Sequence, residues 1–201
     1  GSFHVAGHSG GGPYVLACAI GLQERVISSS IISSIGPVEA VFQATGFSTF
    51  NRLGLMYGRY IPWWLWKIMI FSLYHSRSLD PLKDIKRQEG NRPQADTQLM
   101  DDPQARENCV QSELEAFKPG LIGLAWDTRL LTRLWGFRLE ELKNPVWIWH
   151  GTADNQAPLS MAKYMADRIP SSTSRFLPEA GHLLLFKFWD EILDGLLATS
   201  I

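Results

Sequence analysis

The chain has 201 residues, of which 45% are hydrophobic and 19% charged, and its formal net charge at pH 7 is -1. A chain of this length can bury the core of one domain, and this composition is typical of a folded protein, which argues against a disordered tail or a nucleic-acid partner. Its two cysteines are too few for a disulfide framework and match no zinc-ligand spacing, so we expect no metal, no cofactor and, by default, a cytoplasmic location.

A strand followed by a helix is predicted at the start of the chain. Residues 3–6 (FHVA) form a short apolar, β-prone run. A glycine-rich turn then leads into the apolar run YVLACAIGL, with Pro13 in the first helical turn and Gly21 near the helix end, positions that suit both residues. Residues 25–34 (RVISSSIISS), rich in β-branched and small side chains, predict a second, buried strand.

Helical periodicity replaces this pattern between residues 38 and 143, and a polar stretch around residues 84–102 interrupts it. We interpret this middle section as a helical insertion. Its most apolar part, residues 60–74, contains Lys67 and is shorter than the roughly 20 residues of a membrane-spanning helix. We therefore expect no transmembrane segment, and interpret this part as a helix that is buried or lies at a surface.

Alternation of strands and helices resumes after the insertion. Residues 146–150 (VWIWH) predict a third strand and residues 158–169 a helix, after which residues 174–177 predict a fourth strand and residues 183–198 a closing helix. This alternation predicts an α/β fold, in which helices flank a mostly parallel sheet.

The pentapeptide Gly7-His8-Ser9-Gly10-Gly11 matches the pattern G-x-S-x-G between a predicted strand and a predicted helix. A serine hydroxyl is a weak nucleophile, so it must be held in a sharp turn and exposed to a base. A glycine-rich turn can also simply join a strand to a helix, and the pattern alone leaves both interpretations open.

Asp154 and His182 also follow predicted strands. Because the carboxyl ends of parallel strands meet at one edge of a sheet, we expect both to lie near Ser9. Asp154 could accept a hydrogen bond from the imidazole of His182, which could act as general base toward Ser9. Alternatively, Asp154 caps the helix that follows it. His8 is a competing histidine, whose side chain we expect to point away from Ser9.

Three segments resemble the α/β-hydrolase superfamily. GHSGGGPYVLACA resembles its nucleophile elbow and the helix that follows, WHGTADNQAP and PEAGH resemble its acid and histidine segments, and the order Ser, Asp, His is the family's order. The resemblance covers residues 1–36 and 144–201, which we assign to the hydrolase core, and residues 37–143 lie where the family carries a helical cap. It implies that Ser9, Asp154 and His182 are nucleophile, acid and base; some members place the acid after an earlier strand, which here points to Glu39.

The resemblance implies acyl transfer to water through an acyl-enzyme, with the backbone N–H of Gly10 as one oxyanion donor. The family's other donor comes from a loop after an earlier strand, and its sheet begins with several strands before the elbow. The chain therefore looks truncated, and we expect reduced activity from it alone. We also expect a sheet of about four strands, whose first edge at residues 3–6 could pair with another chain.

Aromatic side chains crowd the insertion, and we expect four of them to contact substrate: Trp63, Trp64, Trp66 and Trp126. An apolar cap over the serine suits a small apolar substrate. These side chains could instead only seal the cap against the core, and a membrane-surface role for the same helix is a less favoured interpretation.

The function expected from these features is hydrolysis of a small apolar carboxylic ester or a related acyl compound. Lipases, thioesterases, peptidases and carbon–carbon bond hydrolases of the family share the triad, and the sequence does not separate them. The alternative is a ligand receptor or scaffold of the same fold with little or no catalysis.

Overall fold

The computed structural model describes residues 1–45, 49–80, 83, 90 and 92–198. Within these residues the strands are β1 (Phe3–His8), β2 (Val26–Ile32), β3 (Val146–Gly151) and β4 (Ser172–Leu177). The α-helices are α1 (Gly12–Gly21), α2 (Val38–Gln43), α3 (Thr49–Tyr57), α4 (Trp63–Leu79), α6 (Gln94–Asp101), α7 (Pro103–Phe117), α8 (Ile122–Leu131), α9 (Leu159–Ala166) and α10 (Leu185–Leu197). Short 3-10 helices are η1 (Ser9–Gly11), η2 (Gly58–Tyr60) and η4 (Leu139–Glu141).

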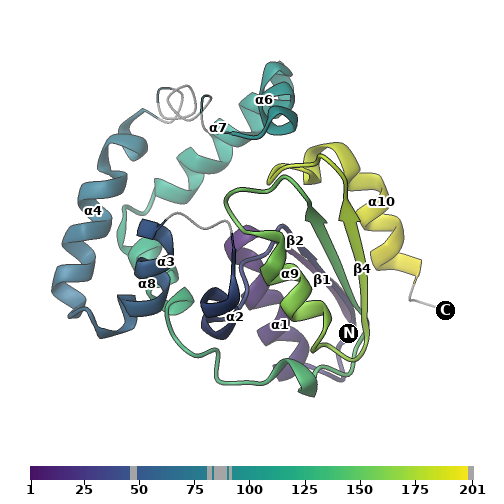
Figure 1. Ribbon diagram of the computed structural model, residues 1–201. Helices are drawn as coiled ribbons and strands as arrows, with labels where there is room; N and C mark the ends of the chain where they lie inside the picture. Colours follow the sequence, from purple (N-terminus) through teal and green to yellow (C-terminus); the bar gives the residue numbers. More distant parts are fainter. Residues whose placement is uncertain (46–48, 81–82, 84–89, 91, 199–201) are drawn as a thin grey trace.

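The strands form one sheet in the order β1-β2-β3-β4, and every neighbouring pair is parallel. This confirms the predicted α/β class. In register, His8 lies beside Ile32 at the end of β1 and β2, and Gly151 lies beside Leu177 at the end of β3 and β4. Loops that follow these strands therefore start from the same edge of the sheet (Figure 1).

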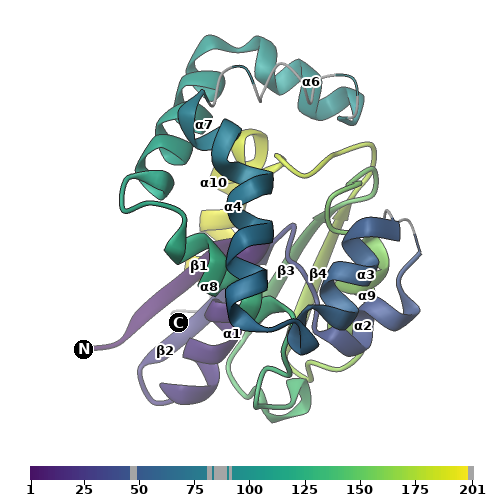
Figure 2. The same cartoon turned by 90° about the vertical axis from the view of Figure 1, so that its left-hand side faces the viewer.

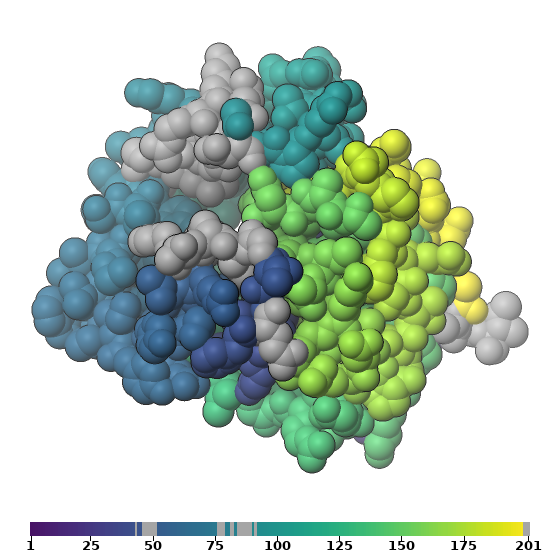
Figure 3. All heavy atoms as spheres, viewed as in Figure 1, coloured from purple at the N-terminus to yellow at the C-terminus, as the bar shows by residue number. Residues whose placement is uncertain are grey.

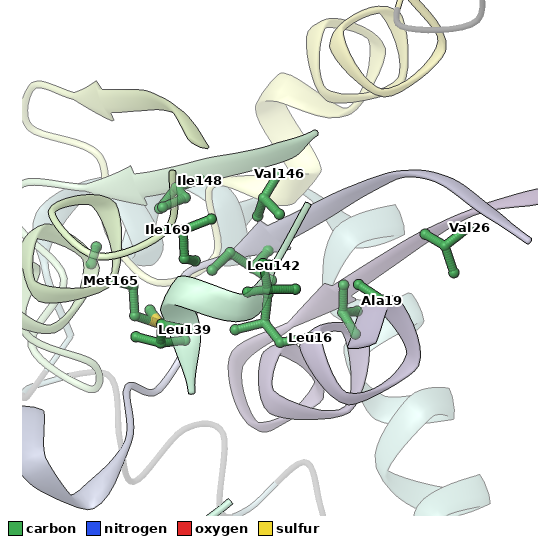
Figure 4. Close-up of a cluster of buried hydrophobic side chains, with 12 residues drawn as sticks. Leu16, Ala19, Val26, Leu139, Leu142, Val146, Ile148, Met165 and Ile169 are labelled. Carbon is green, nitrogen blue, oxygen red and sulfur yellow. The ribbon is translucent and has the colours of Figure 1, made fainter. Parts of the chain in front are cut away.

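Alternation along β3 shows why helices cover both faces of the sheet. Val146 and Ile148 point into a buried cluster with residues of α1 and α9, shown in Figure 4. Trp147 and Trp149 point to the other face, where they pack with Ile192 of α10. Side chains of a strand point alternately to opposite faces, so a strand with four successive apolar residues, as β3 has from Val146 to Trp149, needs a helical layer on each side.

The insertion places α3, α4, α6, α7 and α8 beside and above the sheet (Figures 1 and 2). In the space-filling view these helices, blue to teal, border the green and yellow surface of the core (Figure 3). Both ends of the insertion pack on the core itself. Ala40 of α2 contacts the cluster that contains Met161 of α9, and Leu139 and Leu142 belong to the same cluster as Ile148. The domain boundaries at residues 36 and 144 stay predictions.

Helix α4 contains most of the apolar stretch at residues 60–74. Trp66 and Ile70 are buried on one side of it, whereas Trp64, Ile68 and Phe71 are exposed on the other. The stretch is thus a surface helix with one packed side. Within the described ranges, no helix is both long enough and apolar enough to cross a membrane.

Candidate active site

Ser9 occupies a strained turn between β1 and α1. Its φ angle is +56°, a left-handed conformation that is unfavourable for a residue with a side chain. Gly7 makes the turn possible, because a Cβ there would lie 2.7 Å from the carbonyl oxygen of Gly11 and from Val15 Cγ2. The turn therefore needs this glycine of the pattern, and it presents the Ser9 hydroxyl at the carboxyl end of β1.

The structure brings Ser9, Asp154 and His182 together from three loops, after β1, β3 and β4. His182 Nε2 lies 3.0 Å from Ser9 Oγ, and His182 Nδ1 lies 2.8 Å from Asp154 Oδ2. A carboxylate only accepts hydrogen bonds, so Nδ1 carries the ring proton and Nε2 of the neutral ring can accept a proton from Ser9. This arrangement can activate a serine hydroxyl for nucleophilic attack.

Asp154 is held in place by bonds to both of its oxygens. While Oδ2 faces His182, Oδ1 accepts the N–H groups of Gln156, at 2.8 Å, and Ala157, at 2.9 Å. Burial alone would raise the pKa of this carboxyl, but the hydrogen bond and charge of His182, with the N–H of Ala157 and the nearby His150, hold its pKa below the ordinary value. Asp154 therefore stays ionised beside His182.

The structure does not match either of the two alternatives, in which Asp154 caps α9 or Glu39 serves as the acid. The N-cap of α9 is Pro158, so Asp154 fixes the turn before that helix instead of capping it. Glu39 is exposed in the first turn of α2 and lines a separate cavity with Tyr164 and Arg168.

Two further histidines lie beside His182 and Asp154. His8 donates from Nε2 to the carbonyl oxygen of His182 at 2.8 Å, and the two ring centroids are 4.7 Å apart. We expected the His8 side chain to point away from Ser9, but His8 lines the same cavity as Ser9 and its ring packs on His182. Burial and the neighbouring His182 lower the pKa of His8 to about 4, and burial lowers that of His150, whose Nε2 donates to the carbonyl of Ala157. Both rings are therefore neutral near pH 7.

Asp96 of α6 binds the backbone of the loop that carries His182, which we call the histidine loop. The sequence did not lead us to expect this contact. Its Oδ2 accepts the N–H of His182 at 2.8 Å, and its Oδ1 accepts the N–H of Leu183 at 2.9 Å. The side chain is fully buried, and burial raises the pKa of its carboxyl. A residue of the insertion thus fixes the backbone from which the His182 imidazole projects.

Gly10, the expected oxyanion donor, lies in η1 directly after Ser9. A Cβ at Gly10 would lie 3.5 Å from Leu131 Cδ1, so a side chain of α8 covers the turn. The role of its N–H stays a prediction. Within the described part of the chain, no group of three or more His, Cys, Asp or Glu side chains could hold a metal ion.

A cavity of about 790 Å³ lies over Ser9, His8 and His182, and we call it the Ser9 cavity. Beside it is a second cavity of about 590 Å³, the apolar chamber, lined mainly by apolar side chains of α3, α4 and α8. Tyr74 and Gln156 line both cavities, so the two adjoin there.

The four tryptophans expected to contact substrate lie in different environments. Trp66 lines the apolar chamber, and its Nε1 donates to the carbonyl of Ala125 at 3.0 Å. Trp63 and Trp126 stack on each other, with ring centroids 4.1 Å apart. Trp64 is 62% exposed on the outer side of α4. Successive residues of a helix are turned by 100°, so neighbouring tryptophans cannot share one surface. Contact with substrate stays a prediction.

Comparison with known proteins gives structural matches only: no family model and no curated sequence matches the chain. An α/β-hydrolase fold protein from Nakamurella multipartita is 18% identical with a TM-score of 0.59, and the match covers 92% of this chain and 63% of that one. A serine hydrolase from the polyaromatic-hydrocarbon-degrading bacterium Cycloclasticus zankles is 18% identical with a TM-score of 0.58, over 99% of this chain and 64% of that one.

A third similar structure is a meta-cleavage product hydrolase from Pseudomonas fluorescens IP01, which is 18% identical with a TM-score of 0.55, over 98% of this chain and 64% of that one. The chain therefore spans somewhat less than two thirds of the length of these three proteins. At this level of identity the likeness concerns the fold.

Replacing Asp96 by Asn should loosen the histidine loop. The amide offers one acceptor oxygen and an NH2 group, so one of the two backbone N–H groups loses its partner inside the protein. We expect the free energy of unfolding to fall by about 1–3 kcal/mol. Amide hydrogen exchange at His182 and Leu183 should become faster. The measurements are chemical denaturation and exchange followed by mass spectrometry.

Asp101→Asn is the matched control, because it makes the same change at an exposed position of the same helix. Gly181→Ala disturbs the same contact in a second way. Its Cβ would lie 2.3 Å from Asp96 Oδ1, so the carboxylate must move away. Equal stability and exchange in the Asp96→Asn and Asp101→Asn variants would contradict the assignment.

The lowered pKa values predict how stability depends on pH. His8 titrates near 6.5 when unfolded and at about 4 when folded, so the unfolded chain binds more protons between these values. The free energy of unfolding should therefore decrease as the pH falls from 6.5 to 4, and His150 acts in the same direction. His8→Gln, which keeps a donor for the carbonyl of His182, should give a shallower slope in denaturation measured across this range. An unchanged slope would show that His8 is not held neutral.

Proposed function

The chain has the α/β-hydrolase fold, and on this premise we propose that it is a serine-dependent hydrolase of small apolar carboxylic esters or related acyl compounds. The observation that carries the proposal is the hydrogen bonding of His182, which bonds Ser9 through one ring nitrogen and Asp154 through the other. A buried imidazole held between a hydroxyl and a carboxylate is suited to take up the hydroxyl proton and release it again.

In the first half of the proposed reaction, Ser9 Oγ attacks the substrate carbonyl carbon as His182 Nε2 takes the hydroxyl proton. The new C–O bond places a negative charge on the carbonyl oxygen, toward which we propose that the N–H of Gly10 donates. The ionised carboxylate of Asp154 stabilises the imidazolium through Nδ1.

The tetrahedral intermediate then collapses. The carbonyl re-forms, the bond to the alcohol breaks, and His182 Nε2 gives its proton to the departing alcohol oxygen, which leaves an acyl group on Ser9. A water molecule repeats the sequence: it loses a proton to His182 as it attacks the acyl carbonyl, and the returning proton releases Ser9 and a carboxylic acid.

The two cavities support an apolar substrate. The Ser9 cavity holds the reacting bond, and the apolar chamber meets it at Tyr74 and Gln156. We infer that an apolar acyl or aryl group of the substrate extends past these two side chains into the chamber, where burial of its surface contributes to binding.

An activated Ser9 should react with a fluorophosphonate probe in the full-length protein. Ser9→Ala should abolish labelling, because it removes the attacking oxygen. Ser112→Ala is the matched control, since Ser112 lines the same cavity, and it should leave labelling unchanged. Labelling is measured by mass spectrometry of the modified peptide. A well-folded wild type that does not label would favour a ligand-binding role instead.

Filling the apolar chamber should shorten the acyl chain that the protein prefers. Gly54 lines the chamber, and a Cβ at this position would meet no atom within 4 Å. In the wild type we expect kcat/KM to rise by up to about fourfold for each methylene added to the acyl chain of a p-nitrophenyl ester. Burying one methylene contributes about 0.8 kcal/mol of free energy, which corresponds to this factor. Gly54→Phe should remove this gain and spare the acetate ester.

Gly21→Phe is the control, because Gly21 is equally open and lies at the end of α1. A chain-length preference that is the same in the Gly54→Phe variant and the wild type would show that the acyl group lies elsewhere.

A further inference from the structure

The outer side of α4 carries a row of large apolar side chains. Trp64 is 62% exposed, Ile68 58% and Phe71 54%. Residues four and three positions apart lie on the same side of a helix, so the three side chains form one stripe along α4. Figure 1 shows α4 at the edge of the molecule farthest from α10, and Figure 2 looks onto it.

Packing on the opposite side of α4 prevents the helix from turning this stripe inward. Trp66 and Ile70 are buried in a cluster with Ala125 of α8, and Trp66 Nε1 donates to the carbonyl of Ala125. Large apolar side chains therefore lie on both sides of α4, and among the residues that the structure describes only the side with Trp66 and Ile70 belongs to a buried cluster. A helix with apolar side chains on all sides is ordinarily buried on all sides. We therefore expect the exposed stripe to be an interaction surface for another apolar partner.

The apolar surface continues from α4 onto α8. Trp126 is 51% exposed and Ile122 50%, and they lie four positions apart on that helix. The stacked rings of Trp63 and Trp126 join the two helices. We call the surface of Trp64, Ile68, Phe71, Ile122 and Trp126 the cap face.

The chain segment that contains α4 carries positive charge only, although the exposed Asp127 follows Trp126 on α8. Residues 40–79 contain no Asp or Glu, although the whole chain has 20 such residues among 201. The same segment contains four cationic residues, Arg52, Arg59, Lys67 and Arg77. A segment of this composition is attracted to an anionic surface.

Cations and aromatic rings are paired in η2, just before α4, and in the first turns of α4. The Arg59 guanidinium lies 4.7 Å from the ring centroid of Tyr60, which is 68% exposed, and Lys67 Nζ lies 5.8 Å from that of Trp63. Aromatic rings with a polar edge and long basic side chains are the groups that settle at the boundary between acyl chains and headgroups.

We propose that the cap face docks on an anionic lipid surface. Helix α4 lies along the membrane, with Trp64, Ile68 and Phe71 at the acyl boundary and the basic side chains of Arg59 and Lys67 among the headgroups. A second copy of the chain fits the face less well, because a symmetric contact would bring the same cations together. The inference concerns a surface and does not depend on the chemistry of Ser9.

Cosedimentation of the full-length protein with vesicles tests the proposal. The wild type should bind vesicles of phosphatidylserine and phosphatidylcholine, bind phosphatidylcholine alone more weakly, and lose binding as salt is raised. Ile68→Glu removes an apolar side chain and adds a negative charge, so the ratio of bound to free protein should fall by about tenfold or more. Phe71→Glu should have the same effect.

Leu197→Glu is the matched control: Leu197 is 53% exposed and lies on α10 at the other side of the molecule, so its binding should equal that of the wild type (Figure 1). Two results would overturn the proposal. In one, the wild type binds neither vesicle, and a dimer that Ile68→Glu dissociates would then identify a second copy as the occupant. In the other, the Ile68→Glu and Phe71→Glu variants bind vesicles as the wild type does.

Discussion

The imidazole of His182 is the group on which the account of the site depends. Its Nε2 bonds Ser9 Oγ, and its Nδ1 bonds Asp154 Oδ2. The backbone N–H of the same residue donates to Asp96. All three residues are distant from it in sequence, since even Asp154 is 28 residues away, so the ring is oriented by loops from different strands and by a helix of the insertion. A parallel sheet supplies this arrangement, because it ends all of its strands at one edge.

Local sequence was sufficient to predict the sheet and the meeting of Ser9, Asp154 and His182. Each strand is an apolar or β-branched run that ends at a turn residue, and such runs alternate with helices, which defines strand direction before any contact is known. The strand ends were less well defined. β4 begins at Ser172, two residues before the predicted start, because Ser172 and Thr173 pair with Val146 and Trp147 of β3, and pairing overrides the weak β-propensity of serine.

Long-range contacts of side chains other than Ser9, Asp154 and His182 were not visible in the sequence. Asp96 lies in the polar stretch that we interpreted as an interruption of the insertion, and nothing in its neighbours shows that it is buried against a loop 86 residues later. His8 was misplaced for a related reason: in β1 its side chain direction is fixed by the pleat, but its partner is a distant carbonyl. The four tryptophans were treated as one group, although rotation along α4 separates Trp64 from Trp66.

The ring proton of His182 provides the most direct test of this account. Nitrogen-15 NMR of the histidine-labelled full-length protein, assigned with a His182→Gln variant, reports which ring nitrogen carries the proton in the neutral state. The account predicts a proton on Nδ1, bonded to Asp154, and a bare Nε2 facing Ser9. A proton on Nε2 with Nδ1 bare would mean that Asp154 does not orient the ring, and that His182 cannot take the hydroxyl proton of Ser9.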